Sequence, residues 1–155
     1  MIQRIKRKIA GMPKIRRGFT VDSGAADHVM FPGWFIGMII VQSIGLIRLL
    51  MYVAANGAKI PNKGQTVVDF MSGEGTWAKF IFQIAAINKP LVSVSKLVED
   101  GYRVIFDDDE SYILQKKTGN IITMRKEQGV FVIDAYVTKK PRSPNNEPGF
   151  TRPGR

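Results

Sequence analysis

The residues best suited to chemistry lie in the segment GFTVDSGAADHVM, which covers residues 18–30. A strand-like run ends there in Asp22, Ser23 and Gly24. A carboxylate can activate water when a second carboxylate shares its proton, because two like charges about 3 Å apart cannot both ionise. These three residue types are also common in tight turns, so the triplet alone leaves both a turn and a catalytic loop open.

The chain holds one Asp-Ser-Gly triplet, so a second carboxylate of this kind would have to come from a second copy. A homodimer with twofold symmetry brings identical loops together at its axis. The paired carboxylates would then titrate as a unit. Ser23 could hydrogen-bond near them, and Gly24 would let the two loops approach without a Cβ atom. Water activation between Asp22 and its symmetry mate is therefore one interpretation of the triplet.

Other common catalytic and metal-binding patterns fit this sequence poorly. It contains no cysteine and one histidine, His28, which excludes disulfides and thiolate zinc sites. The acidic run at 107–112 lacks the glycine that a calcium loop needs at its sixth position. The glycine-rich SGEGTWAK lacks the ending of a phosphate-binding loop. We expect His28 to be structural, since no second base or serine elbow accompanies it, and no metal or cofactor is implied.

The composition is globular, with 155 residues of which 45% are hydrophobic and 23% charged. The net charge of +10 resides in the two ends of the chain. Residues 1–17 contain seven basic and no acidic residues, and residues 139–155 contain five basic residues and one acidic residue. Residues 18–138 contain eleven basic and twelve acidic residues, so this part is nearly neutral. Such basic arms can contact nucleic acid or anionic surfaces without reading sequence, or can be solvated tails. The absence of cysteine fits an intracellular setting.

The stretch GWFIGMIIVQSIGLIRLLMYVAA, residues 33–55, contains a single charge, Arg48. Its length and apolarity meet the rule for a membrane-spanning helix, and basic residues precede it as in a positive-inside anchor. Arg48 argues against this, because a charge within hydrocarbon is costly. A buried pair of strands would give the same continuous apolar pattern, so both alternatives stand.

Strand and turn signals predict a mostly β protein with one short helix. Ser93 or Ser95 could cap that helix, and Gly101 would end it. A β-meander of four short strands follows the helix. The other expected elements are a strand at 18–21, a hairpin tip or mobile loop at 55–65, and two strands at 65–71 and 76–87 joined by the turn SGEG.

The segment FTVDSGAADHVM resembles the active-site segment of retropepsin-like aspartic proteases. The nearest form is that of copia-type retrotransposon polyproteins, where an apolar run leads into Asp-Ser/Thr-Gly-Ala and a histidine follows. Three further blocks resemble that family in the same order: YVAANGAKIPNKGQTVV at 52–68, NKPLVSVSKLVEDGYRVIFDDD at 88–109 and KKTGNIITMRKEQGVFVID at 116–134. The resemblance covers about 18–137, and four ordered blocks are more specific than the triplet alone.

The resemblance implies a closed β-barrel or sandwich that acts as an aspartic endopeptidase. It would work as a homodimer and cut its own polyprotein, in the cytoplasm or in a virus-like particle. The catalytic loop would consist of Asp22, Ser23 and Gly24. The residues implied to bind substrate, the last three in or near a flap, are Ala25, Asn56, Gly57 and Ala58.

The expected division of the chain has four parts: a basic tail at 1–17, a retropepsin-like domain at 18–98, a β-meander extension at 99–137 and a basic disordered tail at 138–155. Two alternatives remain. One is a catalytically inactive β domain of the same origin whose basic arms bind nucleic acid or assemble a particle. The other is a membrane-tethered domain that uses residues 33–55, a stretch more apolar than the family resemblance implies.

Overall fold

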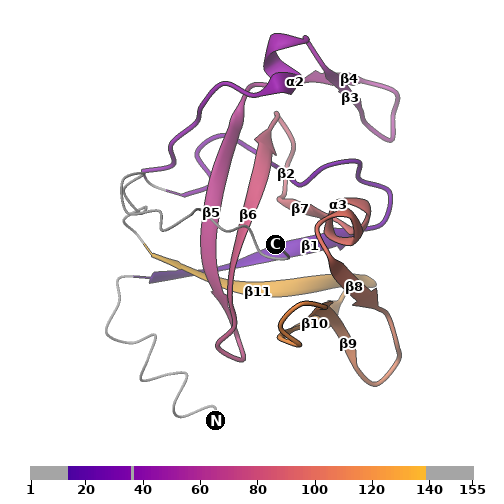
Figure 1. Cartoon of the computed structure of the whole chain (residues 1–155). Coiled ribbons are helices and arrows are strands. Elements are labelled where there is room, and N and C mark those ends of the chain that lie inside the picture. Colours follow the sequence, from indigo (N-terminus) through magenta and orange to yellow (C-terminus); the bar gives the residue numbers. More distant parts are fainter. Residues whose placement is uncertain (1–13, 36, 139–155) are drawn as a thin grey trace.

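The computed structural model describes residues 14–35 and 37–138, which form mainly β-strands (Figure 1). The elements in chain order are β1 (Lys14–Asp22), β2 (Val29–Met30), α2 (Ile44–Ile47), β3 (Met51–Val53), β4 (Lys59–Pro61), β5 (Gln65–Ser72), β6 (Trp77–Ile84), β7 (Leu91–Ser93), α3 (Val94–Glu99), β8 (Tyr102–Ile105), β9 (Ser111–Gln115), β10 (Ile121–Glu127) and β11 (Val130–Thr138). Strands make up 48% of the structure and helices make up 8%. The predicted mostly β, barrel-like fold is confirmed.

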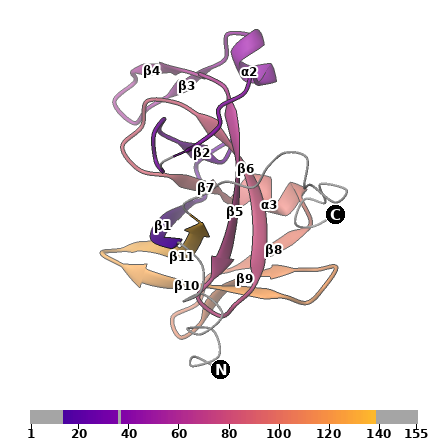
Figure 2. The ribbon, with the colours of Figure 1, turned by 90° about the vertical axis from the view of Figure 1, so that its left-hand side faces the viewer.

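Six strands close into a barrel in the order β1-β7-β2-β6-β5-β11, and β11 pairs back with β1. The β1–β11 pairing is antiparallel and begins with Lys14 opposite Thr138. On its other side β1 runs parallel to β7, which places Asp22 opposite Ser93. Beyond β11 the sheet continues through β10, β9 and β8, which project from the barrel in Figure 2.

A cluster of aromatic rings packs together in the barrel interior, surrounded by aliphatic side chains. Phe19 is fully buried, and its ring centroid lies 5.1 Å from that of Trp34, 5.3 Å from Phe70 and 5.1 Å from Phe82. Alternate residues of β5 and β6 point into this core, as expected for strands with one buried face. The packing around Phe19 therefore holds β1, the strand that leads to Asp22, in place.

Helix α3 begins at the serine cap that the sequence predicts. Ser93 Oγ accepts a hydrogen bond from the backbone N–H of Lys96 at 3.0 Å, which satisfies one of the free donors of the first turn. Leu97 is the buried residue of the helix, and Gly101, with φ of 90°, follows its end. Strand β7, the parallel neighbour of β1, therefore leads directly into the capped helix α3.

Residues 33–55 do not form one continuous helix. Positive φ values at Gly37 (83°) and Leu49 (55°) turn the chain, and the single-turn α2 starts anew between them. Among residues 14–35 and 37–138, no helix is long and apolar enough to cross a membrane. A buried strand pair is also wrong here, because Trp34 and Phe35 are buried whereas most of 39–53 is exposed.

The structure differs from the predicted limits of the two tails and of the meander extension. Residues 14–17 of the predicted basic tail belong to β1 and pair with β11, and the remainder of that tail lies outside the described residues. Thr138, predicted as the first residue of the disordered tail at 138–155, is instead the last residue of β11, and 139–155 lies outside the described residues. Strand β11, which the sequence placed in the meander extension, is also a barrel strand, because it pairs with both β1 and β5. The barrel and the meander therefore share one strand.

Candidate functional site

Asp22 is the last residue of β1, and the chain turns sharply after it. Its Oδ1 atom accepts a hydrogen bond of 2.7 Å from the backbone N–H of Gly24, an Asx-type turn. A Cβ atom on Gly24 would lie 3.3 Å from the same oxygen. The carboxylate is half-buried, so the turn orients it while leaving it accessible from solvent. Ser23 and Gly24 are both exposed.

The segment after this turn is anchored to the barrel through Ser93. The Ser93 hydroxyl donates to the carbonyl oxygen of Ala25 at 2.7 Å, and the Ser93 backbone N–H donates to Nδ1 of His28 at 2.9 Å. Ser93 also lies opposite Asp22 in the parallel pair, so the residue beside the start of the loop holds it through two hydrogen bonds. The carboxylate is therefore displayed from a rigid support.

His28 takes the structural role that the sequence suggests. The side chain is buried, and its ring stacks on Phe80 with centroids 5.0 Å apart and 17° between the planes. Burial first, and then the positive charge of Lys96, lower the pKa of His28 to about 3. The imidazole is therefore neutral near pH 7, and its Nδ1 accepts the hydrogen bond from Ser93.

The predicted flap residues form the tip of the β3–β4 hairpin. The backbone N–H of Ala58 donates to Oδ1 of Asn56 at 3.0 Å, and Gly57 has φ of 84°, a value that glycine adopts without strain. All three residues are exposed. In Figure 1 this hairpin and α2 stand at one end of the molecule, with the hairpin above the loop that follows β1. The predicted hairpin tip at 55–65 is thus present in its first residues, whereas Lys59–Pro61 form strand β4.

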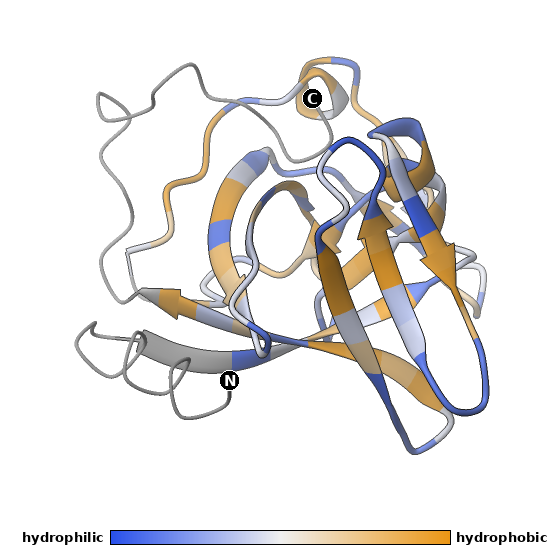
Figure 3. Ribbon diagram, turned by 60° about the horizontal axis from the view of Figure 1, so that its bottom comes forward, coloured by the Kyte–Doolittle hydropathy of each residue, from blue (hydrophilic) through white to orange (hydrophobic). Residues whose placement is uncertain are grey.

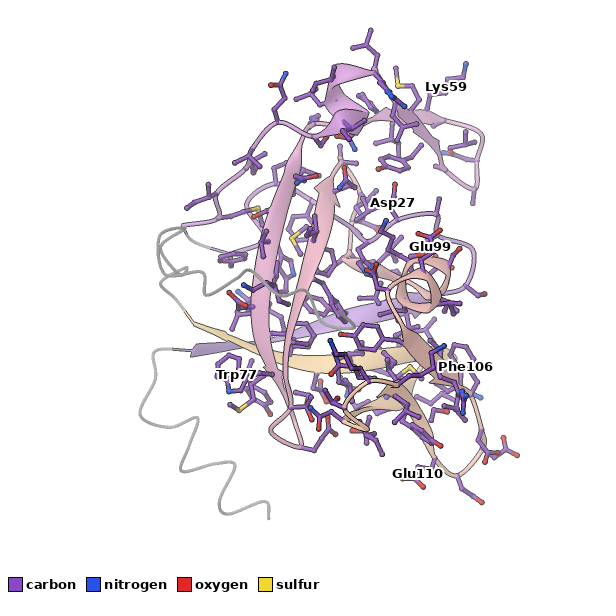
Figure 4. The ribbon with its side chains drawn as sticks, viewed as in Figure 1. Asp27, Lys59, Trp77, Glu99, Phe106 and Glu110 are labelled. Carbon is purple, nitrogen blue, oxygen red and sulfur yellow. The ribbon has the colours of Figure 1, made fainter. Side chains whose placement is uncertain are left out.

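A hydrogen bond joins the hairpin to the Asp22 loop. The Tyr52 hydroxyl, on β3, donates to Oδ2 of Asp27 at 3.1 Å, and Figure 4 shows Asp27 facing the hairpin. Burial raises the pKa of Tyr52 to about 12; the hydrogen bond from Asn62 opposes this shift, and the negative charge of Asp27 adds to it. Tyr52 therefore stays protonated and keeps this hydrogen bond at ordinary pH.

Asn62, just after β4, is the centre of the same network. Its Nδ2 donates to the Tyr52 hydroxyl at 3.1 Å and to Gln83 Oε1 at 2.9 Å. Its Oδ1 accepts from the Ser43 hydroxyl at 2.7 Å and from the Gly64 backbone N–H at 2.8 Å. Both amide protons and both oxygen lone pairs are used, so the side chain is fully satisfied although it is buried.

Sequence reasoning missed this network. Asp27 lies within the segment 18–30 and Asn62 within the predicted hairpin tip or loop at 55–65, and neither position by itself indicates a buried network. Apart from the Gly64 N–H, which is two residues from Asn62, the partners of Asn62 and Tyr52 lie 10 to 25 residues away along the chain, which no local pattern reveals. The one local signal was Tyr52 itself, an aromatic residue with a hydroxyl at the end of an apolar run.

The structure brings Asp22, Ser23, Gly24 and Ala25 together as one turn and places the hairpin over the same loop. Among the described residues, no group of three or more His, Asp or Glu side chains could hold a metal ion. A hollow of about 680 Å³ lies on the meander between the β8–β9 turn and β10, and no residue of the Asp22 loop lines it.

Comparison with known proteins adds no relative. No family model matches the chain, and no curated protein or solved structure matches it. Function must therefore be argued from the residues of the loop, the hairpin and the barrel that carries them.

Proposed function

We propose that this chain is an aspartic endopeptidase of the copia-type, retropepsin-like class, active as a homodimer inside the cell or in a virus-like particle. The observation that supports this best is the Asp22 turn, in which a half-buried carboxylate is oriented by the Gly24 N–H at a barrel strand end. The Tyr52–Asp27 hydrogen bond, which ties an exposed hairpin to the same loop, adds to it.

The proposed reaction takes place between Asp22 and Asp22 of a second copy. One carboxylate is protonated and the other ionised, since the pair shares a proton. The ionised carboxylate removes a proton from water, which attacks the peptide carbon, while the protonated one donates to the carbonyl oxygen. The tetrahedral intermediate then collapses as the nitrogen takes up a proton and leaves. Ser23 and Gly24 complete each loop.

Substrate would lie between the paired loops and the two hairpins. In this proposal Ala25 contacts the peptide from below, while Asn56, Gly57 and Ala58 contact it from above. The base of the hairpin is held by Tyr52 through Asp27 and Asn62, so opening for substrate would be confined to the exposed tip. The substrate class is an extended polypeptide, most simply the polyprotein that contains this domain.

The test is cleavage of a denatured protein mixture between about pH 4 and 7. Wild type is compared with Asp22→Asn and with Asp109→Asn, an exposed aspartate of the β8–β9 turn that serves as matched control. Light scattering on the same samples gives the oligomeric state. Cleavage by wild type and Asp109→Asn, with none by Asp22→Asn, supports the proposal. A folded wild-type dimer that cuts nothing refutes it.

A second function is favoured by where the charge lies, since the basic excess belongs to the two chain ends and not to residues 18–138. In this alternative the barrel is inactive and the basic arms bind nucleic acid or assemble a particle. Binding to unrelated nucleic acids that weakens steeply with salt and is unaffected by Asp22→Asn would support it.

A further inference from the structure

An apolar ridge covers α2, β3 and the chain that leads to them, from Ile39 to Val53. Nine of the fourteen large hydrophobic side chains exposed in the described residues lie within it. The most exposed are Ile44 (68%), Leu49 (79%) and Val53 (71%). Figure 3 colours this segment mostly as hydrophobic, although it stands outside the barrel. Clustered exposure of this kind marks an interaction surface, whereas single exposed residues do not.

The side of α2 that faces the barrel packs on buried polar residues. Ser43, buried beneath α2, caps that helix by accepting from the Leu46 N–H at 3.0 Å and donates to Asn62. A Cβ atom on Gly45 would lie 2.5 Å from the Asn62 amide nitrogen, so that side of α2 packs directly on the buried amide. The inward side of α2 is therefore polar or small, and its apolar side chains point to solvent.

Leu49 has an unusual backbone conformation. Its φ is 55°, in a region that residues with a Cβ atom rarely adopt. Backbone hydrogen bonds on both sides impose this turn, from Leu49 N–H to Leu46 O at 3.1 Å and from Leu50 N–H to Gly45 O at 2.7 Å. Glycine would relieve the strain, yet the position holds a leucine that points into solvent. Strain retained at an exposed apolar residue is typical of functional sites.

The chain around the ridge is basic, although Asp27 of the Asp22 loop accepts a hydrogen bond from Tyr52. No Asp or Glu occurs from residue 28 to residue 68, whereas Arg48, Lys59 and Lys63 do. All three cations are exposed, and Lys59 lies opposite Val53 in the hairpin. Figure 4 shows Lys59 at the same end of the molecule as α2. A partner for this surface should therefore offer an apolar interior and negative charge at its rim.

We propose that the apolar ridge binds the surface of an anionic lipid bilayer. Ile44, Ile47 and Leu49 would enter the headgroup region, and the three cations would pair with lipid phosphates and carboxylates. A second copy of the chain fits less well, because it would bring the same three positive charges to both sides of the contact. This association is peripheral, needs no spanning helix and does not depend on Asp22.

The absence of cysteine permits a site-specific test in the full chain. Leu49→Cys is labelled with a polarity-sensitive fluorophore and mixed with phosphatidylcholine vesicles that contain about 30% phosphatidylserine. Ile121→Cys, exposed on β10, is the matched control. We expect a blue shift and a several-fold increase in intensity at residue 49 only. The basic chain ends are the same in both proteins, so binding through them alone would leave the two probes alike and would overturn the proposal.

A second measurement removes the ridge instead of labelling it. Ile44→Ser combined with Ile47→Ser should lower the affinity for these vesicles at least about tenfold, because two large apolar side chains are lost. Ile121→Ser should change it less than about twofold. Buried Trp34 reports through its fluorescence that each variant is folded. If the double variant binds vesicles as wild type does, or abolishes only self-association, the ridge is not a lipid-binding surface.

Discussion

Replacing Asn62 with alanine should destabilise the protein more than any exposed substitution. The side chain is buried, with 3% of its surface exposed, and makes four hydrogen bonds. Its removal leaves the buried Ser43 hydroxyl and the buried Gly64 N–H without the oxygen to which they donate. It also removes the hydrogen bond that Asn62 donates to Tyr52, the residue that holds the hairpin to the Asp22 loop.

The expected loss follows from these contacts. A neutral hydrogen bond contributes about 1 kcal/mol net, and a buried group left without a partner costs about 1–3 kcal/mol. Water can replace part of what is lost on the Tyr52 side, because that hydroxyl is only half-buried. We therefore expect Asn62→Ala to lower the free energy of unfolding by about 3–5 kcal/mol, a large share of the total for a domain of this size.

Urea denaturation followed by tryptophan fluorescence measures this difference. Asn88→Ala, at an exposed asparagine between β6 and β7, is the matched control and should stay within about 0.5 kcal/mol of wild type. A loss below about 1 kcal/mol at Asn62, with normal cooperativity, would refute the reasoning that these hydrogen bonds hold the hairpin against the barrel.

Three further predictions concern the barrel and the loop. The folded pKa of His28, about 3, lies below its unfolded value of 6.5. The unfolded chain therefore binds the extra proton first, and stability should fall as pH drops from about 7 to 5, by up to about 1.4 kcal/mol per unit below 6.5. Urea titrations across this range should show a shallower slope for His28→Asn, and equal slopes would contradict the assignment. Phe19→Ala, which empties the centre of the aromatic core, should cost about 3–5 kcal/mol in the same denaturation assay, and a loss under about 1 kcal/mol would mean that the core is not packed as described. Gly24→Ala places a Cβ atom 3.3 Å from Asp22 Oδ1. It should reduce peptide cleavage about tenfold while leaving the urea midpoint nearly unchanged, and full activity would mean that the Gly24 turn does not position the carboxylate.

The features predictable from the sequence were those set by neighbouring residues. Ser93 caps α3 because its hydroxyl reaches an N–H three residues on, and the SGEG turn closes the β5–β6 hairpin for an equally local reason. The Asp22 turn belongs to the same group, because its hydrogen bond spans two residues. Whether a second Asp22 faces it, and whether the hairpin contacts substrate, stay predictions.

Long-range and surface features were not predictable in this way. Hydropathy counts apolar residues without showing which way they point, so 33–55 looked like a spanning or buried segment although most of 39–53 is exposed. Asn62 gave no signal, because its value depends on partners from three other parts of the chain. The double pairing of β11 depends on register across the whole barrel, which local propensity does not specify.

The seam between β1 and β11 has a consequence for how the molecule is made. Its paired residues, from Lys14 opposite Thr138 to Val21 opposite Phe131, are more than 100 positions apart in sequence. During synthesis β1 leaves the ribosome before the other barrel strands, and its partner β11 is the last of these strands to emerge. We expect the edge of β1 that pairs with β11 to stay unpaired until β11 has been made. Closure of the barrel should then be the slow, late step of folding. The same seam brings the two described ends of the chain side by side, so a circular permutant that joins them through a short linker, with new termini in the exposed β8–β9 turn, would convert this late long-range contact into an early local one.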